Sequence, residues 1–353
     1  MNNSTARVIS ARDQAIATQV RDAAALFGRD DLLAVVATGK DFKKFLHAML
    51  TQDVKGLADG TLRTTCLCDP QGAVLATAIQ VLGPDRAVLW TERSLAPVLR
   101  DTLDRYVIMD EVELSIDDDL ALVQLIGATS PALMQRLGLP EPALGSWHTA
   151  QLLGMPVDLG QAVAGGAHGS PAGEALPCFF IQLQRDHLGD VAAALIEAGA
   201  TPGSHAAFET LRIASGWPSL TAGDVDPGSL PLEIGLKTAV DYRKGCYMGQ
   251  EAIAMMTYRG QIRRHLCWVE REGEALPGAG WQLRDVAGKR AGKMGSAVLL
   301  ADGRLWGLAS VQRKAYAPGA VLTAASDDGT ATAQVRIVAT TVPSVLSAEG
   351  TAA

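Results

Sequence analysis

The last third of the chain is divided by short turn sequences at a spacing that leaves room for strands and little else. After Arg259, glycine and aspartate recur at Glu272-Gly273, Ala287-Gly288, Ala301-Asp302-Gly303 and Asp327-Asp328-Gly329. Both residue types favour tight turns, and the segments between these turns are short and apolar. Closely spaced strands joined by such turns predict an all-β barrel. The predicted strands are 266–269, 280–284, 293–300, 305–311, 320–325 and 331–338.

The preceding two thirds of the chain mix helical and strand periodicities. Asp41 is placed to cap a helix that runs through Leu50, because its carboxylate can accept from the free N–H groups of the first turn. Strands and a second helix follow, and this order predicts an α+β unit with helices on one face of a largely antiparallel sheet. The pattern recurs more loosely from residue 130, which indicates a second α+β unit. The predicted helices are 10–27, 41–50, 95–105, 130–137, 188–198, 205–215 and 249–258, and the predicted strands are 32–37, 61–68, 73–81, 87–91, 112–116, 121–126, 147–153, 156–159 and 178–184.

Two segments show neither helical nor strand periodicity. Residues 162–177 are rich in Gly, Ala, Ser and Pro and are predicted to form an exposed, mobile loop. Residues 340–353 are predicted to form a frayed tail. We therefore expect an α+β region at 1–258, a barrel domain at 259–341 and a disordered tail at 342–353.

Bulk properties narrow the compartment and the partners. A net charge of −7 argues against a general nucleic-acid surface, which normally shows a basic excess. Residues 1–14 are polar where a signal peptide would be apolar, and the chain has no uninterrupted apolar run of the about 18 residues that a membrane span needs. Five cysteines are an odd and sparse set that argues against a disulfide framework. We expect a cytoplasmic protein without a membrane or nucleic-acid partner.

The octapeptide Lys244-Gly245-Cys246-Tyr247-Met248-Gly249-Gln250-Glu251 combines groups that activate a thiol. A cation two residues before Cys246 and a helix predicted just after it both favour thiolate over thiol. The glycines allow a positive φ or a close approach to a ligand. The pattern predicts an exposed, reactive Cys246 with Lys244 as its catalytic partner. The alternative is a tight turn whose cysteine is a small, buried apolar residue.

The other cysteines and the histidines show no metal-binding pattern. Cys66 and Cys68 lack the zinc C-x₂-C spacing, and residues two apart on a strand face the same side, so both thiols can pack into the sheet. Cys178 and Cys267 lie in apolar strands and are expected in the core. Because iron–sulfur clusters normally take four thiolates, the single Cys246 is not expected to hold one stably. No metal site is predicted, and no hydrolase, NTPase or dinucleotide motif occurs.

The octapeptide resembles the signature of the YgfZ family, K-G-C-[YF]-x-G-Q-E, without a gap. Other segments similar to the family lie at 45–54, 68–72, 209–218 and 231–233. The resemblance implies a folate-binding protein that supports assembly or repair of iron–sulfur clusters, with iron–sulfur enzymes or assembly proteins as partners. It also implies the fold of the glycine cleavage T protein, an aminomethyltransferase: two interwoven α+β units followed by the all-β barrel.

The resemblance further implies a site for tetrahydrofolate or a related reduced folate. The carboxylate of Glu233 would accept the amidine edge of the pterin, and Trp217 and Tyr247 would stack on its ring. Arg259 and Arg263 would pair with the carboxylates of the glutamate tail. A core tryptophan and solvated arginines are the alternatives. The predicted folate-binding residues are Trp217, Glu233, Tyr247, Gln250, Glu251, Arg259 and Arg263.

Two other functions fit parts of the sequence. Aminomethyltransferases have an Asp-Asp pair just after a Gly-Gly turn, and the second carboxylate contacts the reacting nitrogen of folate. The matching segment here, Gly72-Ala73-Val74-Leu75-Ala76-Thr77, contains neither acid. These transferases also lack K-G-C-Y at the position of Cys246, so active transfer is the alternative and not the expected function. The third possibility is a folate-binding or protein-interaction module without chemistry.

Overall fold

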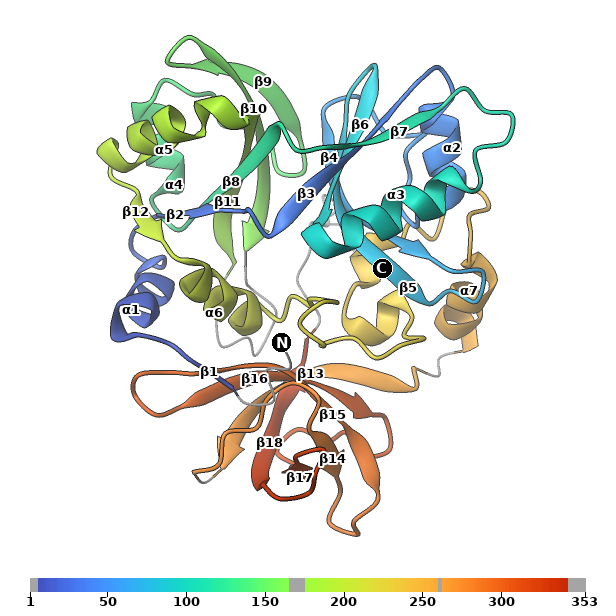
Figure 1. The fold of residues 1–353 in the computed structure, drawn as a ribbon, viewed down its shortest axis with the longest axis vertical. Helices are drawn as coiled ribbons and strands as arrows, with labels where there is room; N and C mark the ends of the chain where they lie inside the picture. Colours follow the sequence, from blue (N-terminus) through green and yellow to red (C-terminus); the bar gives the residue numbers. More distant parts are fainter. Residues whose placement is uncertain (1–5, 165–174, 260–261, 273, 342–353) are drawn as a thin grey trace.

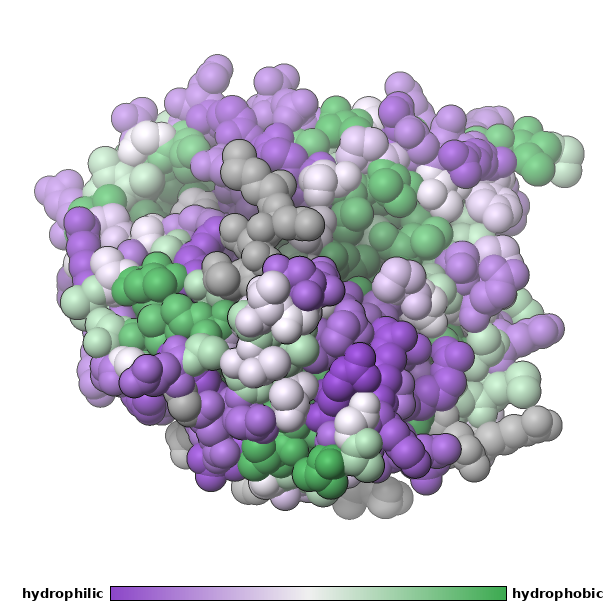
Figure 2. Space-filling model, turned by 60° about the horizontal axis from the view of Figure 1, so that its bottom comes forward, coloured by the Kyte–Doolittle hydropathy of each residue, from purple (hydrophilic) through white to green (hydrophobic). Residues whose placement is uncertain are grey.

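The computed structural model describes residues 6–164, 175–259, 262–272 and 274–341. Two α+β units lie side by side above a β-barrel (Figure 1). On the face seen in Figure 2, hydrophobic side chains form separate patches between hydrophilic ones. None of the helices in these ranges is long and apolar enough to cross a membrane.

The first unit is an antiparallel sheet of five strands in the order β4-β5-β6-β3-β7. β3 is apolar from Leu32 to Ala37 because both of its faces are covered. Leu33 and Val35 pack against the helices α2 and α3, whereas Ala34 and Val36 pack against the second unit. The elements are β3 (Leu32–Thr38), α2 (Phe42–Met49), β4 (Thr61–Cys68), β5 (Val74–Leu82), β6 (Arg86–Glu92), η1 (Arg93–Leu95), α3 (Ala96–Asp104) and β7 (Glu113–Asp117).

The second unit is a sheet of six strands in the order β12-β2-β8-β11-β10-β9. β2 precedes the first unit in the chain yet pairs with β8, which follows that unit. The two units are therefore interwoven, as the family resemblance implies. The elements are α1 (Ala11–Gln19), β2 (Ala25–Gly28), β8 (Leu120–Ile126), α4 (Ser130–Arg136), β9 (Trp147–Leu152), β10 (Met155–Ala164), β11 (Leu176–Gln184), η2 (Arg185–His187), α5 (Leu188–Glu197), β12 (Thr201–Gly203) and α6 (His205–Ser215).

The third part is a closed barrel. Its strands follow the order β15-β14-β17-β18-β13-β16, and β16 pairs again with β15 to close the ring. This confirms the predicted barrel and all six of its strands. A short strand near the N-terminus, β1 (Arg7–Val8), adds to β15, so the barrel sheet also recruits the start of the chain. The strands are β13 (Arg264–Glu272), β14 (Gln282–Arg284), β15 (Arg290–Leu299), β16 (Leu305–Gln312), β17 (Val321–Ala325) and β18 (Thr332–Thr340).

The segment between α6 and the barrel contains η3 (Pro231–Ile234), η4 (Lys237–Ala239) and α7 (Gln250–Arg259).

A buried ionic cluster connects α6 to the barrel. Arg212 Nε lies 2.7 Å from Glu209 Oε1, and its Nη1 lies 2.8 Å from Asp224 Oδ2, a carboxylate with no exposed surface. Its Nη2 donates to Ser296 Oγ on β15 at 2.7 Å.

Three local predictions need correction. The helix predicted at 10–27 ends at Gln19, and residues 25–28 form β2 because β8 and β12 pair with it on either side. Asp41 is the N-cap of α2, but its carboxylate makes no capping bond and instead accepts from the Glu111 amide at 2.9 Å.

The predicted mobile loop at 162–177 is shorter at both ends, because β10 continues to Ala164 and β11 begins at Leu176. Residues 165–174 within it and the predicted tail at 342–353 lie outside the described residues. The predicted domain boundaries remain a prediction.

Candidate functional site

The octapeptide runs beside the C-terminal end of α2 and leads into α7. The Met248 amide donates to the Ala48 carbonyl at 3.0 Å, and the Asp241 amide donates to the Thr51 carbonyl at 3.0 Å. These contacts join segments about 200 residues apart in sequence, and the first contact links two segments that the family resemblance had singled out.

Lys244 fixes this junction from inside. Its Nζ donates to the carbonyls of His47 (2.6 Å), Leu50 (2.7 Å) and Gln52 (2.8 Å). An ammonium has three N–H donors, so all of them are used, and the cation also stabilises the C-terminal end of α2. Burial lowers the pKa of Lys244 to about 8, against the opposing charge of Asp53. Lys244, the predicted catalytic partner of Cys246, thus binds three backbone carbonyls and holds the octapeptide against the end of α2.

Gly249 brings the octapeptide against the turn between β4 and β5. Its φ is +80°, and a side-chain carbon there would lie 2.5 Å from the Asp69 carbonyl oxygen and 2.8 Å from Gly72 Cα. Gly72 itself has a φ of +82°. Only glycines permit this backbone-to-backbone contact, which explains why both segments contain one.

All five cysteines are free. Cys246 is exposed, whereas the others are buried, namely Cys66, Cys68, Cys178 and Cys267. Burial raises the pKa of the Cys66 and Cys178 thiols to about 12. Burial likewise raises the pKa of the Cys68 and Cys267 thiols. The expectation that these four thiols pack in the interior is confirmed, and the alternative of a buried Cys246 does not hold.

The two aromatic residues predicted to stack on folate lie in one apolar cluster. Tyr247 is 9% exposed in a core with Cys66, Cys68 and Ile253, and Trp217 packs against that core while partly buried. Burial raises the pKa of the Tyr247 phenol. Tyr247, which belongs to the octapeptide, and Trp217 therefore pack in the same apolar cluster.

The predicted acidic and basic residues form a pair. The Glu233 side chain is fully buried, and its Oε1 accepts from Arg263 Nε at 3.1 Å. Its Oε2 accepts from the Leu230 amide at 3.1 Å, so both carboxylate oxygens have partners. Arg263 keeps 60% of its side chain exposed. Arg259 is the last residue of α7, and its side chain lies outside the described part.

Gln250 and Glu251 have different surroundings at the start of α7. Gln250 Oε1 accepts from the Tyr247 amide at 3.2 Å and so caps the segment that leads into the helix. Glu251 is exposed in the first turn of the helix.

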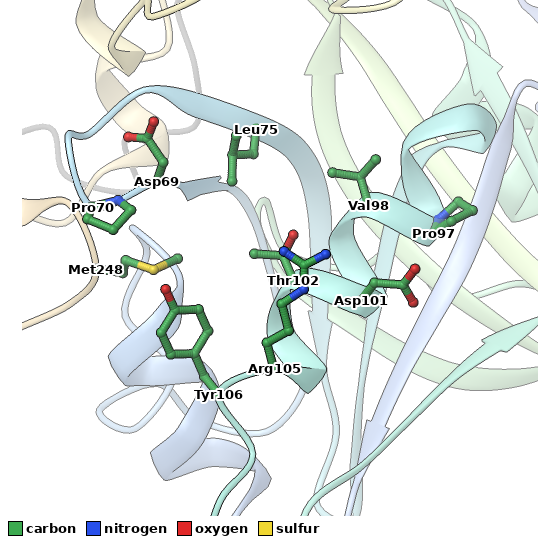
Figure 3. A pocket seen from close by; sticks show the side chains of 10 residues that line it. All are labelled: Asp69, Pro70, Leu75, Pro97, Val98, Asp101, Thr102, Arg105, Tyr106 and Met248. Atoms are coloured by element: carbon green, nitrogen blue, oxygen red, sulfur yellow. The ribbon is translucent and has the colours of Figure 1, made fainter.

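A cavity of about 540 Å³ that no motif had indicated lies between α3 and the octapeptide. Pro70 and Met248 form one side, and Pro97 and Val98 of α3 form the other, with Arg105 between them (Figure 3). Its walls come from segments distant in sequence, so no local pattern could have revealed it.

A second feature missed by motif searches is a histidine–aspartate pair. His47 Nδ1 lies 2.9 Å from Asp53 Oδ1. A side-chain carbon at Gly245 would lie 3.6 Å from the other ring nitrogen, Nε2. Spacing between histidines could not reveal this pair, although Asp53 belongs to the family-like segment at 45–54.

The family model of the GCVT N-terminal domain matches residues 7–244. The chain belongs to this GCVT family. A tRNA-modifying protein YgfZ from Edwardsiella ictaluri is 28% identical, over 78% of this chain and 81% of the relative. An aminomethyltransferase from Rubrobacter xylanophilus is 30% identical, over 83% of this chain and 77% of the relative. The resemblance to YgfZ proteins is thereby confirmed.

The fold of this GCVT family member also has a close counterpart among solved structures. The glycine cleavage system aminomethyltransferase T of Bartonella henselae superposes with a TM-score of 0.78 over 94% of this chain and 89% of that chain. At 19% sequence identity the likeness concerns the fold alone. It confirms the predicted α+β fold of the T-protein type with a C-terminal barrel.

Proposed function

We propose that this GCVT family member binds tetrahydrofolate or a related reduced folate and assists assembly or repair of iron–sulfur clusters in cytoplasmic client enzymes. The observation that carries the proposal is the exposed Cys246 within an octapeptide that matches the YgfZ signature. Lys244 holds that octapeptide against the end of α2 and Gly249 holds it against the turn between β4 and β5, so Cys246 lies in a firmly docked segment.

The pair of Glu233 and Arg263 supports the folate part of the proposal. Arg263 uses its Nε for Glu233 while most of its side chain stays exposed, which leaves its terminal nitrogens accessible to a carboxylate. Guanidinium groups bind carboxylates in a bidentate manner, and a folate tail ends in carboxylates. The partly buried Trp217 supplies aromatic surface for the pterin ring, and Tyr247, which is 9% exposed, packs in the same cluster.

Calorimetric titration with tetrahydrofolate should give a binding isotherm, and the ligand should raise the melting temperature. A ligand that binds only the native state stabilises it by about 2.7 kcal/mol at a hundred times its dissociation constant. Arg263→Gln should weaken binding, whereas Arg284→Gln, a change of an exposed residue on the barrel strand β14, should not. Neither heat nor stabilisation at millimolar tetrahydrofolate would contradict the folate proposal.

The 30% identity to an aminomethyltransferase makes transfer of a one-carbon unit the second candidate. The residues at the matching positions are Ala76 and Thr77, which are 1% and 8% exposed and supply no carboxylate. We expect purified protein, mixed with aminomethyl-lipoyl carrier and tetrahydrofolate, to form no methylenetetrahydrofolate above background. Turnover in that assay would favour the transferase function.

The name of the YgfZ relatives connects them with tRNA modification. A chain with a net charge of −7 is poorly suited to hold an RNA backbone, because phosphate contacts need a basic surface. We propose that any effect on tRNA passes through an iron–sulfur enzyme that this protein supports.

A further inference from the structure

Two arginines lie opposite each other at the end of the ladder between β13 and β16. The register of these antiparallel strands pairs Arg264 with Gln312. One residue further out, the Arg313 amide donates to the Arg263 carbonyl at 3.0 Å. Residues directly opposite each other lie on the same face of a sheet, and like charges at such a pair are destabilising. An anion beside these two exposed guanidinium groups would offset their repulsion.

The protein itself supplies an anion to only one of the two arginines. Glu233 Oε1 accepts from Arg263 Nε at 3.1 Å. The Arg313 side chain makes no hydrogen bond or ion pair with another residue in the described part of the chain. The neighbouring carboxylate of Asp226 already pairs with Arg264 Nη1 at 2.8 Å. The Arg313 guanidinium therefore remains available to a ligand.

His265 indicates where the Arg313 guanidinium lies. His265 shares a face of the sheet with Arg263, because the two residues are two positions apart along the chain. Burial and the charge of Arg313 lower the pKa of His265, whereas the charge of Glu233 acts in the opposite direction. The Arg313 guanidinium and the Glu233 carboxylate therefore lie close to the same imidazole ring. Tyr316 packs against that ring, with the two ring centroids 5.0 Å apart.

We propose that Arg313 binds the carboxylate of the second glutamate in the tail of a polyglutamylated reduced folate. In the proposed function, Arg263 offers its terminal nitrogens to the first glutamate of that tail. Each further glutamate adds one carboxylate, and Arg313 is the cation directly across the ladder on the same face. Guanidinium groups bind carboxylates in a bidentate manner. The inference rests on the proposed folate function and adds the class of folate that the site prefers.

Calorimetric titration of the wild-type protein with the monoglutamate and the triglutamate of tetrahydrofolate tests this preference. The triglutamate should bind about tenfold more tightly, because hydrogen bonds between charged groups are the stronger class. Arg313→Gln should remove this difference, while the affinity for the monoglutamate changes by less than about twofold. Arg313→Lys keeps the charge and should retain most of the preference, which distinguishes anion binding from a change in structure.

Arg284→Gln, a change of an exposed arginine on β14, is the matched control and should leave the preference unchanged. Equal affinities of the wild type for the two forms, or a preference that survives in Arg313→Gln, would overturn the inference and leave the folate proposal intact. Binding of neither form would contradict the folate proposal as well. Binding of transfer RNA to the wild type but not to Arg313→Gln would assign this arginine to an RNA backbone and would also overturn the inference.

Discussion

Cys246→Ser should abolish support of iron–sulfur enzymes in cells while leaving the fold intact. Cys246 is exposed, so serine removes no core contact, and the free energy of unfolding should change by less than about 0.5 kcal/mol. Serine cannot supply a thiolate, because its hydroxyl stays protonated near neutral pH. The measurement is complementation of cells that lack the protein, with the activity of an iron–sulfur enzyme and iron–sulfur-dependent tRNA modification as readouts. Full activity of the variant would favour a module without chemistry.

The matched control is Cys178→Ser, which changes a buried thiol in the second unit and should retain cellular activity. Limited alkylation of the wild type near neutral pH should modify Cys246 first, because the pKa of the Cys178 thiol is raised to about 12 by burial. Bound folate should slow the labelling if the thiol faces the ligand. If Cys66 or Cys68 were alkylated before Cys246, Cys246 would not be the reactive thiol that the proposed mechanism requires.

Arg212→Met should destabilise the protein by about 3–5 kcal/mol, as expected when one partner of a buried ion pair is removed. The variant leaves Asp224, which has no exposed surface, and Glu209 without their cation. Denaturant unfolding monitored by fluorescence measures the change. The contact to Ser296 also joins α6 to the barrel, so the unfolding transition should lose cooperativity between these parts.

The destabilisation caused by Arg212→Met should depend on pH in a defined direction. Burial raises the pKa of Glu209, but the charge of Arg212 and its hydrogen bond outweigh burial and lower the net pKa. The wild-type protein therefore loses stability as the pH falls through that lowered pKa, whereas without Arg212 the carboxyl accepts a proton more readily. The difference in the free energy of unfolding between the wild type and Arg212→Met should become smaller from pH 7 towards pH 4.

Arg304→Met removes an exposed pair with Asp302 and should cost at most about 1 kcal/mol. An equal loss in both variants would show that the buried cluster around Arg212 is not a special source of stability.

Local sequence patterns predicted the elements well where neighbouring residues decide the structure. Glycine and aspartate turns predicted all six barrel strands, because turn chemistry and the alternation of strand residues act over a few positions. The prediction was wrong at residues 25–28, where pairing with β8 and β12 overrides helical spacing. It was also wrong about the Asp41 carboxylate. This carboxylate accepts a hydrogen bond from the Glu111 amide, 70 residues away, and not from the first turn of α2.

The sequence by itself determined that an octapeptide with a cysteine, a cation and two flexible glycines exists, and which family shares it. Only the tertiary structure decided what each of these residues does. The Lys244 ammonium binds the carbonyl of His47, 197 residues away, and Gly249 meets the Asp69 turn. The same contacts bring the His47 ring beside Gly245. Periodicity and turn preference depend on sequence neighbours, whereas these partners meet only because the octapeptide packs across the end of α2.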